Sequence, residues 1–149
     1  MASSSTNPLG INGIKTLLQN DVTYIYWTNT GQSLVCRVAL DPLTLSKRGE
    51  VEVLVNGTSA DDFAIDEQRG LLFLAVGESN EVVSVGLDGG SVKTVVGGLN
   101  ESVVANPTSV AVGKEGDVVY VTTTGGLESK INGTFVEGGQ VVEVWVGDC

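Results

Sequence analysis

The sequence predicts an all-β fold made of three consecutive four-stranded antiparallel sheets. Nearly every segment is a run of β-branched residues bounded by Gly, Asn or Asp, and none shows the spacing of an amphipathic helix. Three segments, TYIYWTNT, LLFLAVGES and VVYVTTTGG, are versions of one strand. Their aromatic residues Tyr26, Phe73 and Tyr120 lie 47 residues apart each time. A four-stranded repeat of about 45 residues is typical of a propeller blade.

The strands follow in the same order in each unit. After an N-terminal tail (1–8), the units span about 9–56, 57–104 and 105–149. The first strands are NGIKTL, DDFAID and PTSVAV, and the third strands are SLVCRVAL, EVVSVGLD and QVVEVWVG. EVEVLV and SVKTVV provide fourth strands for the first two units, whereas the third unit offers no obvious fourth strand. That unit instead carries an insertion at 125–139, which we interpret as a surface loop or as a lid over a ligand pocket.

Three blades cannot close a ring by themselves, because propellers have about 4–8 blades. The two outer sheets would leave open edges and apolar faces, which are an aggregation hazard. Either a second copy of the chain completes a six-bladed ring, or the sequence is a piece of a larger protein. We expect the homodimer, with Trp145 covering the joint between subunits and the other aromatic residues packing between blades.

Composition excludes several classes of function. The net charge of −10 and the absence of a basic patch argue against nucleic-acid binding. No apolar run approaches the roughly 20 residues that span a bilayer, so no membrane partner is expected. With no histidine, the chain alone cannot build a Ser-His-Asp triad or a histidine-ligated metal site. The abundant oxygen ligands favour a hard cation such as Ca²⁺, and we expect no organic cofactor.

The cellular compartment is only weakly indicated. The start, MASSSTNPLG, lacks the basic and apolar regions of a signal peptide, so a cytoplasmic location is the default. Three glycosylation sequons, at Asn56, Asn100 and Asn132, leave secretion open. Cys36 and Cys149 lack the spacing of a metal-binding or redox motif, and we interpret Cys36 as a small core residue.

Polar residues gather at one end of the repeat. The 47-residue period places Asn12, Asp61 and Thr108 at equivalent starts of the channel-lining strands, the first with a hairpin two residues longer. Strand alternation then points Asp61 into the channel and Asp62 sideways into the loop. The loops after the second strands open on the same side and add further pocket-lining candidates. The expected substrate-binding residues are therefore Asn29, Asp62, Glu78, Thr108 and Thr123. A capped turn remains the alternative role for Asp61.

At these residues the sequence resembles a known family. NGIK at Asn12, DDFAID at Asp61 and NPTSVAVG before VVYVTTTGG are similar to the later blades of senescence-marker-protein/gluconolactonase-like (strictosidine-synthase-like) propellers, especially the fungal members. The resemblance implies half of a six-bladed propeller with a central divalent cation, usually calcium. By matching motifs, it implies Asn12 as a metal ligand and Asp61 as both metal ligand and catalytic base. Asp62 stands where the family commonly has glycine, and the family's other ligands come from earlier blades that this chain lacks.

Three functions remain open. The first is metal-assisted lactone or ester hydrolysis with Asp61 as the base. The second is a non-hydrolytic cyclase or pericyclase of fungal secondary metabolism, of the hetero-Diels–Alder type, which uses the same pocket to orient a reactive substrate. The third is a non-catalytic binding fragment. We expect an enzyme acting on a small molecule, although fold-level resemblance does not fix the chemistry.

Overall fold

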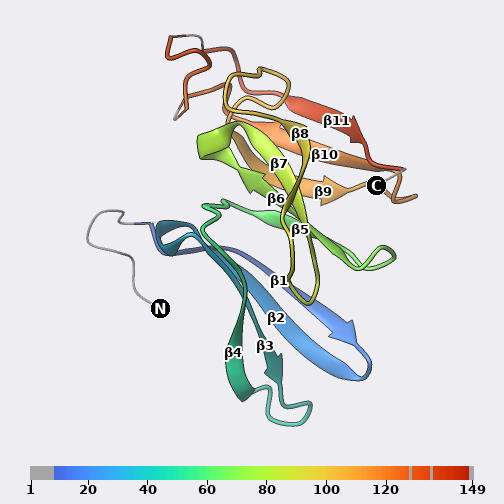
Figure 1. Cartoon of the computed structure of the whole chain (residues 1–149). Coiled ribbons are helices and arrows are strands. Elements are labelled where there is room, and N and C mark those ends of the chain that lie inside the picture. The colour runs from blue at the N-terminus through green and yellow to red at the C-terminus, as the bar shows by residue number, and fades with distance from the viewer. Residues whose placement is uncertain (1–8, 128, 135, 148–149) are drawn as a thin grey trace.

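The computed structural model contains three separate antiparallel sheets that follow one another along the chain (Figure 1). It describes residues 9–147 except 128 and 135, so the predicted tail (1–8) lies outside the described residues. The first sheet is β1 (Ile11–Gln19), β2 (Val22–Asn29), β3 (Leu34–Leu40) and β4 (Lys47–Asn56). The second is β5 (Phe63–Asp66), β6 (Leu71–Val76), β7 (Glu81–Gly86) and β8 (Lys93–Gly97). The third is β9 (Pro107–Val112), β10 (Val118–Thr123) and β11 (Val141–Trp145).

Each sheet is a simple meander, with every strand paired to the next along the chain. The all-β propeller-type fold predicted from the repeat is therefore confirmed. Within the described residues the third sheet has three strands, in line with a sequence that offers no obvious fourth. Two one-turn 3-10 helices, η1 (Thr30–Gln32) and η2 (Gly77–Ser79), follow the second strands 47 residues apart. No helix in the described part of the chain is long and apolar enough to span a membrane.

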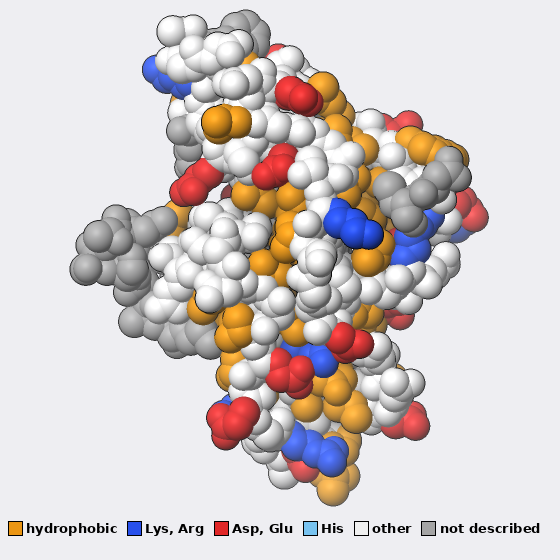
Figure 2. Space-filling view, in the orientation of Figure 1, with side chains coloured by type: hydrophobic (Ala, Val, Ile, Leu, Met, Phe, Trp, Pro, Cys, Tyr) orange, Lys and Arg blue, Asp and Glu red, His pale blue; other side chains and the backbone are white. Residues whose placement is uncertain are grey.

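The repeat also fixes how the sheets pack. Tyr26 and Phe73 sit on the central strands of the first two sheets, and both side chains are fully buried. Tyr26 belongs to an apolar cluster shared between the first and second sheets, and Phe73 to one shared between the second and third. Because side chains alternate across a strand, each sheet offers one apolar face to the sheet before it and one to the sheet after it. The main core thus consists of two layers between three sheets, and Figure 2 shows apolar side chains along these junctions.

The innermost strands lie side by side, with β5 between β1 and β9. The amide of Gly13 donates to the carbonyl of Asp61, and the amide of Asp62 donates to the carbonyl of Thr108, both at 3.2 Å. These matching bonds confirm that Asn12, Asp61 and Thr108 hold equivalent positions. The longer first hairpin is confirmed as well, because Lys15 pairs with Tyr26 where Ala64 pairs with Phe73.

Candidate functional site

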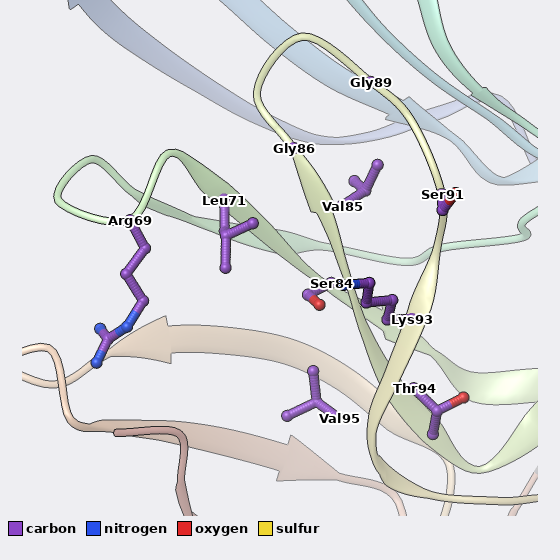
Figure 3. A pocket seen from close by; sticks show the side chains of 10 residues that line it. All are labelled: Arg69, Leu71, Ser84, Val85, Gly86, Gly89, Ser91, Lys93, Thr94 and Val95. Atoms are coloured by element: carbon purple, nitrogen blue, oxygen red, sulfur yellow. The ribbon is translucent and has the colours of Figure 1, made fainter. Parts of the chain in front are cut away.

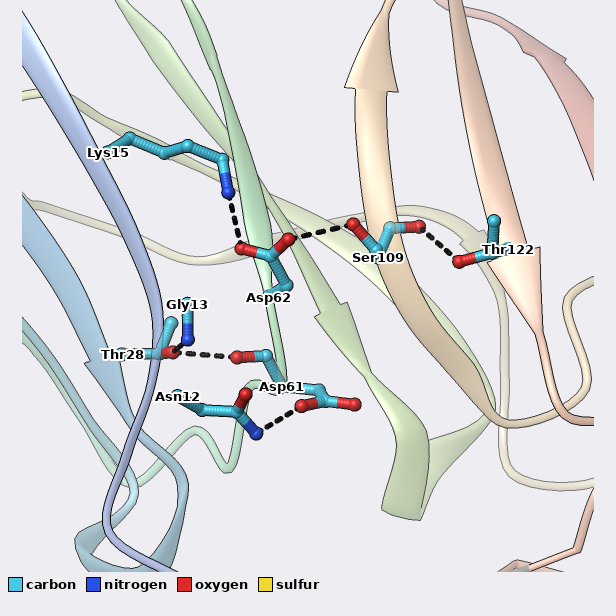
Figure 4. Close-up of polar contacts among 8 residues, drawn as sticks. All are labelled: Asn12, Gly13, Lys15, Thr28, Asp61, Asp62, Ser109 and Thr122. Atoms are coloured by element: carbon cyan, nitrogen blue, oxygen red, sulfur yellow. Dashed lines mark hydrogen bonds and ion pairs between the residues drawn. The ribbon is translucent and has the colours of Figure 1, made fainter.

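Asp61 is anchored where the first and second sheets meet (Figure 4). The hydroxyl of Thr28, which is fully buried, accepts from the amide of Gly13 at 2.8 Å and donates to the carbonyl of Asp61 at 2.6 Å. A β-carbon at Gly13 would lie 2.9 Å from the Cα of Asp62, so glycine is what allows this close approach of the strands. Two donors of the first sheet, the Gly13 amide and the Thr28 hydroxyl, therefore hold the carbonyl of Asp61 at this junction.

The carboxylate of Asp61 meets the amide of Asn12. Asn12 Nδ2 donates to Asp61 Oδ1 and lies 3.4 Å from Thr30 Oγ1. The two residues that the repeat aligned are thus in direct contact across neighbouring sheets. The amide nitrogen of Asn12 faces the carboxylate in this contact, so a hard cation shared by the two residues requires the amide oxygen to turn toward Asp61 instead.

A cavity of about 200 Å³ opens above this pair. Among the residues predicted for the site, the structure brings Asn12, Asp61 and Glu78 together in its lining. Thr30 and Gly77 lie in the loops after the second strands, which were expected to open on this side, whereas Leu9, Ser59, Asn106 and Pro107 were not predicted. Thr30 and Gly77 come from the 3-10 turns that follow β2 and β6, and a repeated polar turn after the second strand was the available signal. Residues from all three sheets therefore border one cavity.

Three of the remaining predicted residues, Asn29, Thr108 and Thr123, make hydrogen bonds within turns or between strands. Asn29 is buried, accepts from the amide of Gln32 at 3.2 Å and donates to its side chain, so it caps η1. Thr108 contacts Thr122, with 3.0 Å between the two hydroxyl oxygens. Thr123 accepts from the amide of Gln140 at 3.2 Å. None of the three lines the cavity.

Asp62 takes a different direction from the one the sequence predicted. Its carboxylate accepts from Lys15 Nζ at 2.7 Å and from Ser109 Oγ at 2.8 Å, so it joins the innermost strands of all three sheets (Figure 4). The expected turn into the loop was therefore wrong. Burial raises the pKa of Asp62, but hydrogen bonds from Lys15, the Phe63 amide and Ser109 outweigh it. The pKa therefore lies below its usual value.

We expect Asp62→Asn to lower the free energy of unfolding by about 1 kcal/mol at neutral pH, because the Lys15–Asp62 ion pair is partly exposed to water, which limits its contribution. Because the folded-state pKa is depressed, this stabilisation exists above the unfolded-state pKa of about 3.9 and disappears as pH falls through the lower folded value. The deficit should therefore shrink in strong acid. Urea midpoints at both pH values test this, with the exposed Glu67→Gln as control; equal midpoints at neutral pH would contradict it.

The cavity offers the type of oxygen ligand that a hard cation prefers, but fewer such ligands than the cation takes. The cavity offers carboxylate, amide and hydroxyl oxygens, which suit Ca²⁺. Calcium takes about 6–8 oxygen ligands. No group of three or more His, Cys, Asp or Glu side chains that could hold a metal occurs among the described residues. Asn12, Asp61 and Glu78 are thus candidate ligands that need additional oxygen donors.

The insertion predicted as a loop or lid reaches the rim of this cavity. Ser129 Oγ donates to the carbonyl oxygen of Glu78 at 2.8 Å. Ile131 is buried, whereas Leu127 is 68% exposed. The insertion is therefore attached next to a residue that lines the cavity, which is the position a lid would require.

A larger cavity of about 720 Å³ lies on the second sheet, beside β7 and β8 (Figure 3). The repeat explains its origin. Arg37, the partner of Tyr26 in register, fills the first junction, whereas the equivalent Ser84, the partner of Phe73, has a short side chain. None of the predicted site residues lines this space. We therefore place the candidate chemistry in the smaller cavity, where the carboxylates and amides converge.

Comparisons with known proteins support the fold. No family model matches the chain, and no curated protein matches it. Among solved structures, a luciferin-regenerating enzyme is 25% identical with a TM-score of 0.70, and the match covers 94% of this chain and 46% of that one. A putative 6-phosphogluconolactonase from Bacteroides uniformis is 14% identical with a TM-score of 0.59, covering 83% and 37%. A structure of a nidogen/laminin complex is 15% identical with a TM-score of 0.58, covering 78% and 39%. The chain thus spans less than half the length of each of these structures.

Proposed function

We propose that this chain provides the metal-binding part of a propeller hydrolase that opens small lactones or esters. The observation that carries the proposal is the contact between Asn12 and Asp61 at the base of a cavity bordered by all three sheets. The likeness in fold to a luciferin-regenerating enzyme and to a putative 6-phosphogluconolactonase supports it. The resemblance of the motifs at these two residues supports the same assignment.

Asp61 acts as the general base. Its carboxylate accepts a proton from a water molecule, whose oxygen attacks the acyl carbon; the ring or ester oxygen leaves and takes up a proton. Asn12 holds the carboxylate in place through its amide, and Thr28 fixes the backbone of Asp61. Calcium, when bound by Asn12, Asp61 and Glu78, supplies positive charge that polarises the substrate carbonyl.

Asp61→Asn tests this assignment. We expect the variant to lose calcium affinity in a calorimetric titration and to hydrolyse a panel of aldonolactones and aryl esters about 10²–10⁴-fold more slowly, because general-base catalysis contributes that much. Glu67→Gln, an exposed carboxylate change in the β5–β6 turn, serves as the control and should match the wild type. Unchanged turnover by a folded Asp61→Asn protein would refute the role of Asp61.

The small number of side chains in the cavity that could bind a metal favours a second candidate. This candidate is a non-hydrolytic cyclase or pericyclase of fungal secondary metabolism that uses the same cavity. Such an enzyme accelerates a reaction by holding a reactive substrate in one conformation and needs no base. The two functions differ in a simple observable. A cyclase would keep its activity in the presence of a calcium chelator and in Asp61→Asn, whereas the hydrolase would lose it. Binding without turnover would instead favour a non-catalytic role.

A further inference from the structure

The two outer faces of the three-sheet array are uncovered in the described chain. Tyr26, Phe73 and Tyr120 hold the same repeat position, yet Tyr26 and Phe73 are fully buried and Tyr120 is 41% exposed. The second sheet covers Tyr26 and the third covers Phe73. No described sheet covers the face that carries Tyr120. The repeat therefore predicts that a further sheet belongs there.

The exposed face of the third sheet is apolar in the same way as the buried ones. Strand register places Val141 and Trp145 on the same side as Tyr120, because they pair with Thr122 and Val118. Val141 is 71% exposed and Trp145 is 63% exposed. We call this surface, with Glu143 at its centre, the blade 3 face.

The first sheet has a complementary uncovered face. Trp27, Cys36 and Val38 form a small buried cluster that includes no residue of the second sheet, so they lie on the opposite side of the sheet from Tyr26. Strand register adds Ile14 and Val53 to this side, and they are 59% and 54% exposed. We call this surface the blade 1 face. Apolar side chains reach the molecular surface over β1–β4 in Figure 2.

One buried polar atom on the blade 1 face lacks a partner. Trp27 is 8% exposed, and its Nε1 is the one buried side-chain nitrogen or oxygen without a hydrogen bond among the described residues. A buried donor without an acceptor destabilises the folded state. An acceptor on a chain packed against the blade 1 face would pair with this donor.

We propose that a second copy of this chain covers both faces, so that the blade 3 face of each copy packs on the blade 1 face of the other. The chain contains the template for this contact twice, since the first and second junctions pair the same two kinds of face. The Tyr120 hydroxyl and the Glu143 carboxylate on the blade 3 face are acceptors that Trp27 Nε1 can use. Two copies related by a two-fold axis close a ring of six sheets, and a closed ring leaves no free face for further growth.

The ring also completes the candidate site. In the proposed ring, one more step of the ladder that runs from Gly13 to Asp61 and from Asp62 to Thr108 would bring Thr108 beside Asn12 of the partner subunit. The mouth of the channel then holds two copies of the Asn12–Asp61 pair, which supply the oxygen donors that one copy lacks. The dimer does not depend on hydrolysis, so its test is independent of activity.

Light scattering coupled to size exclusion at micromolar concentration tests the assembly. We expect a single species of about 31 kDa, twice the chain mass of 15.4 kDa. A folded 15.4 kDa monomer would overturn the proposal and assign both faces to blades of another chain. Growth beyond the dimer with concentration would overturn ring closure, since unclosed contacts between different faces propagate into filaments.

Two single variants then separate this joint from a contact between like faces. Ile14→Glu damages only the blade 1 face and Tyr120→Glu only the blade 3 face, and every joint of the ring contains one of each. Each variant alone should therefore be monomeric, with dimerisation weakened at least about 30-fold. Mixing the two should restore a heterodimer through the one joint whose faces are both intact. Leu43→Glu, in the β3–β4 loop, is the matched control and should stay dimeric. If either Ile14→Glu or Tyr120→Glu alone remains dimeric while folded, the proposed pairing is wrong.

Discussion

Phe73→Ala should lower the free energy of unfolding by about 3–5 kcal/mol, the largest effect on stability that we expect from a single truncation. Phe73 is fully buried on the central strand of the second sheet. Its ring packs in the cluster that includes Val119 and Val121 of the third sheet, so the variant leaves a cavity in the layer that joins the two sheets. Chemical denaturation followed by circular dichroism measures the loss, at several protein concentrations because the proposed dimer would make the apparent stability depend on concentration.

Leu43→Ala provides the comparison for this prediction. Leu43 is 91% exposed, so its truncation should change the free energy of unfolding by less than about 0.5 kcal/mol. If Phe73→Ala is no more destabilising than this control, the second and third sheets do not share a packed layer.

The fold was predictable because its information is repeated. One β-branched run with an aromatic residue at its centre occurs three times, and each copy independently specifies a strand with two apolar faces. The same repetition predicted which residues start the channel-lining strands, and the ladder through Asp61 and Thr108 confirms it. Repeats are informative in this way because residues at equivalent positions contact equivalent neighbours in adjacent units.

The site was predictable only in part, because equivalence along the chain does not determine what a side chain contacts. Asp62 was expected to turn into the loop, but Lys15 and Ser109 lie on the two flanking strands and hold its carboxylate between them. The direction of that carboxylate depends on side chains from three sheets, which the alternation of a single strand cannot encode. Asn29 illustrates a second limit, since a polar residue after a strand can cap a turn as well as bind a ligand.

Arg37 joins the first and second sheets through polar contacts, whereas Phe73 joins the second and third through apolar packing. Its guanidinium is nearly buried and donates to the carbonyl of Leu87 at 3.0 Å and to the Asp88 carboxylate at 2.6 Å, both in the second sheet's β7–β8 connection. Within the first sheet it donates to Glu52 at 2.8 Å and to the hydroxyl of Tyr26 at 3.4 Å. Burial lowers the pKa of Arg37, but hydrogen bonds with Tyr26, Asp88 and Glu52 outweigh it and leave the pKa above its usual value. The group therefore stays charged, and its contribution to stability should not vary with pH in the ordinary range.

Arg37→Met should cost about 2–4 kcal/mol of unfolding free energy, because methionine fills part of the space but donates no hydrogen bond. The side chains of Glu52 and Asp88 are 49% and 78% exposed, so water can replace the arginine at both carboxylates and the ion pairs themselves contribute little. The main loss lies at the carbonyl of Leu87 and the hydroxyl of Tyr26, which stay in the junction without this donor. Arg37→Lys should recover only part of the stability, since an ammonium group cannot span both sheets as a planar guanidinium does. Arg48→Met, an exposed change on neighbouring β4, is the control in the same urea titration. A midpoint for Arg37→Met equal to that of Arg48→Met would mean that Arg37 makes no net contribution to the junction between the first two sheets.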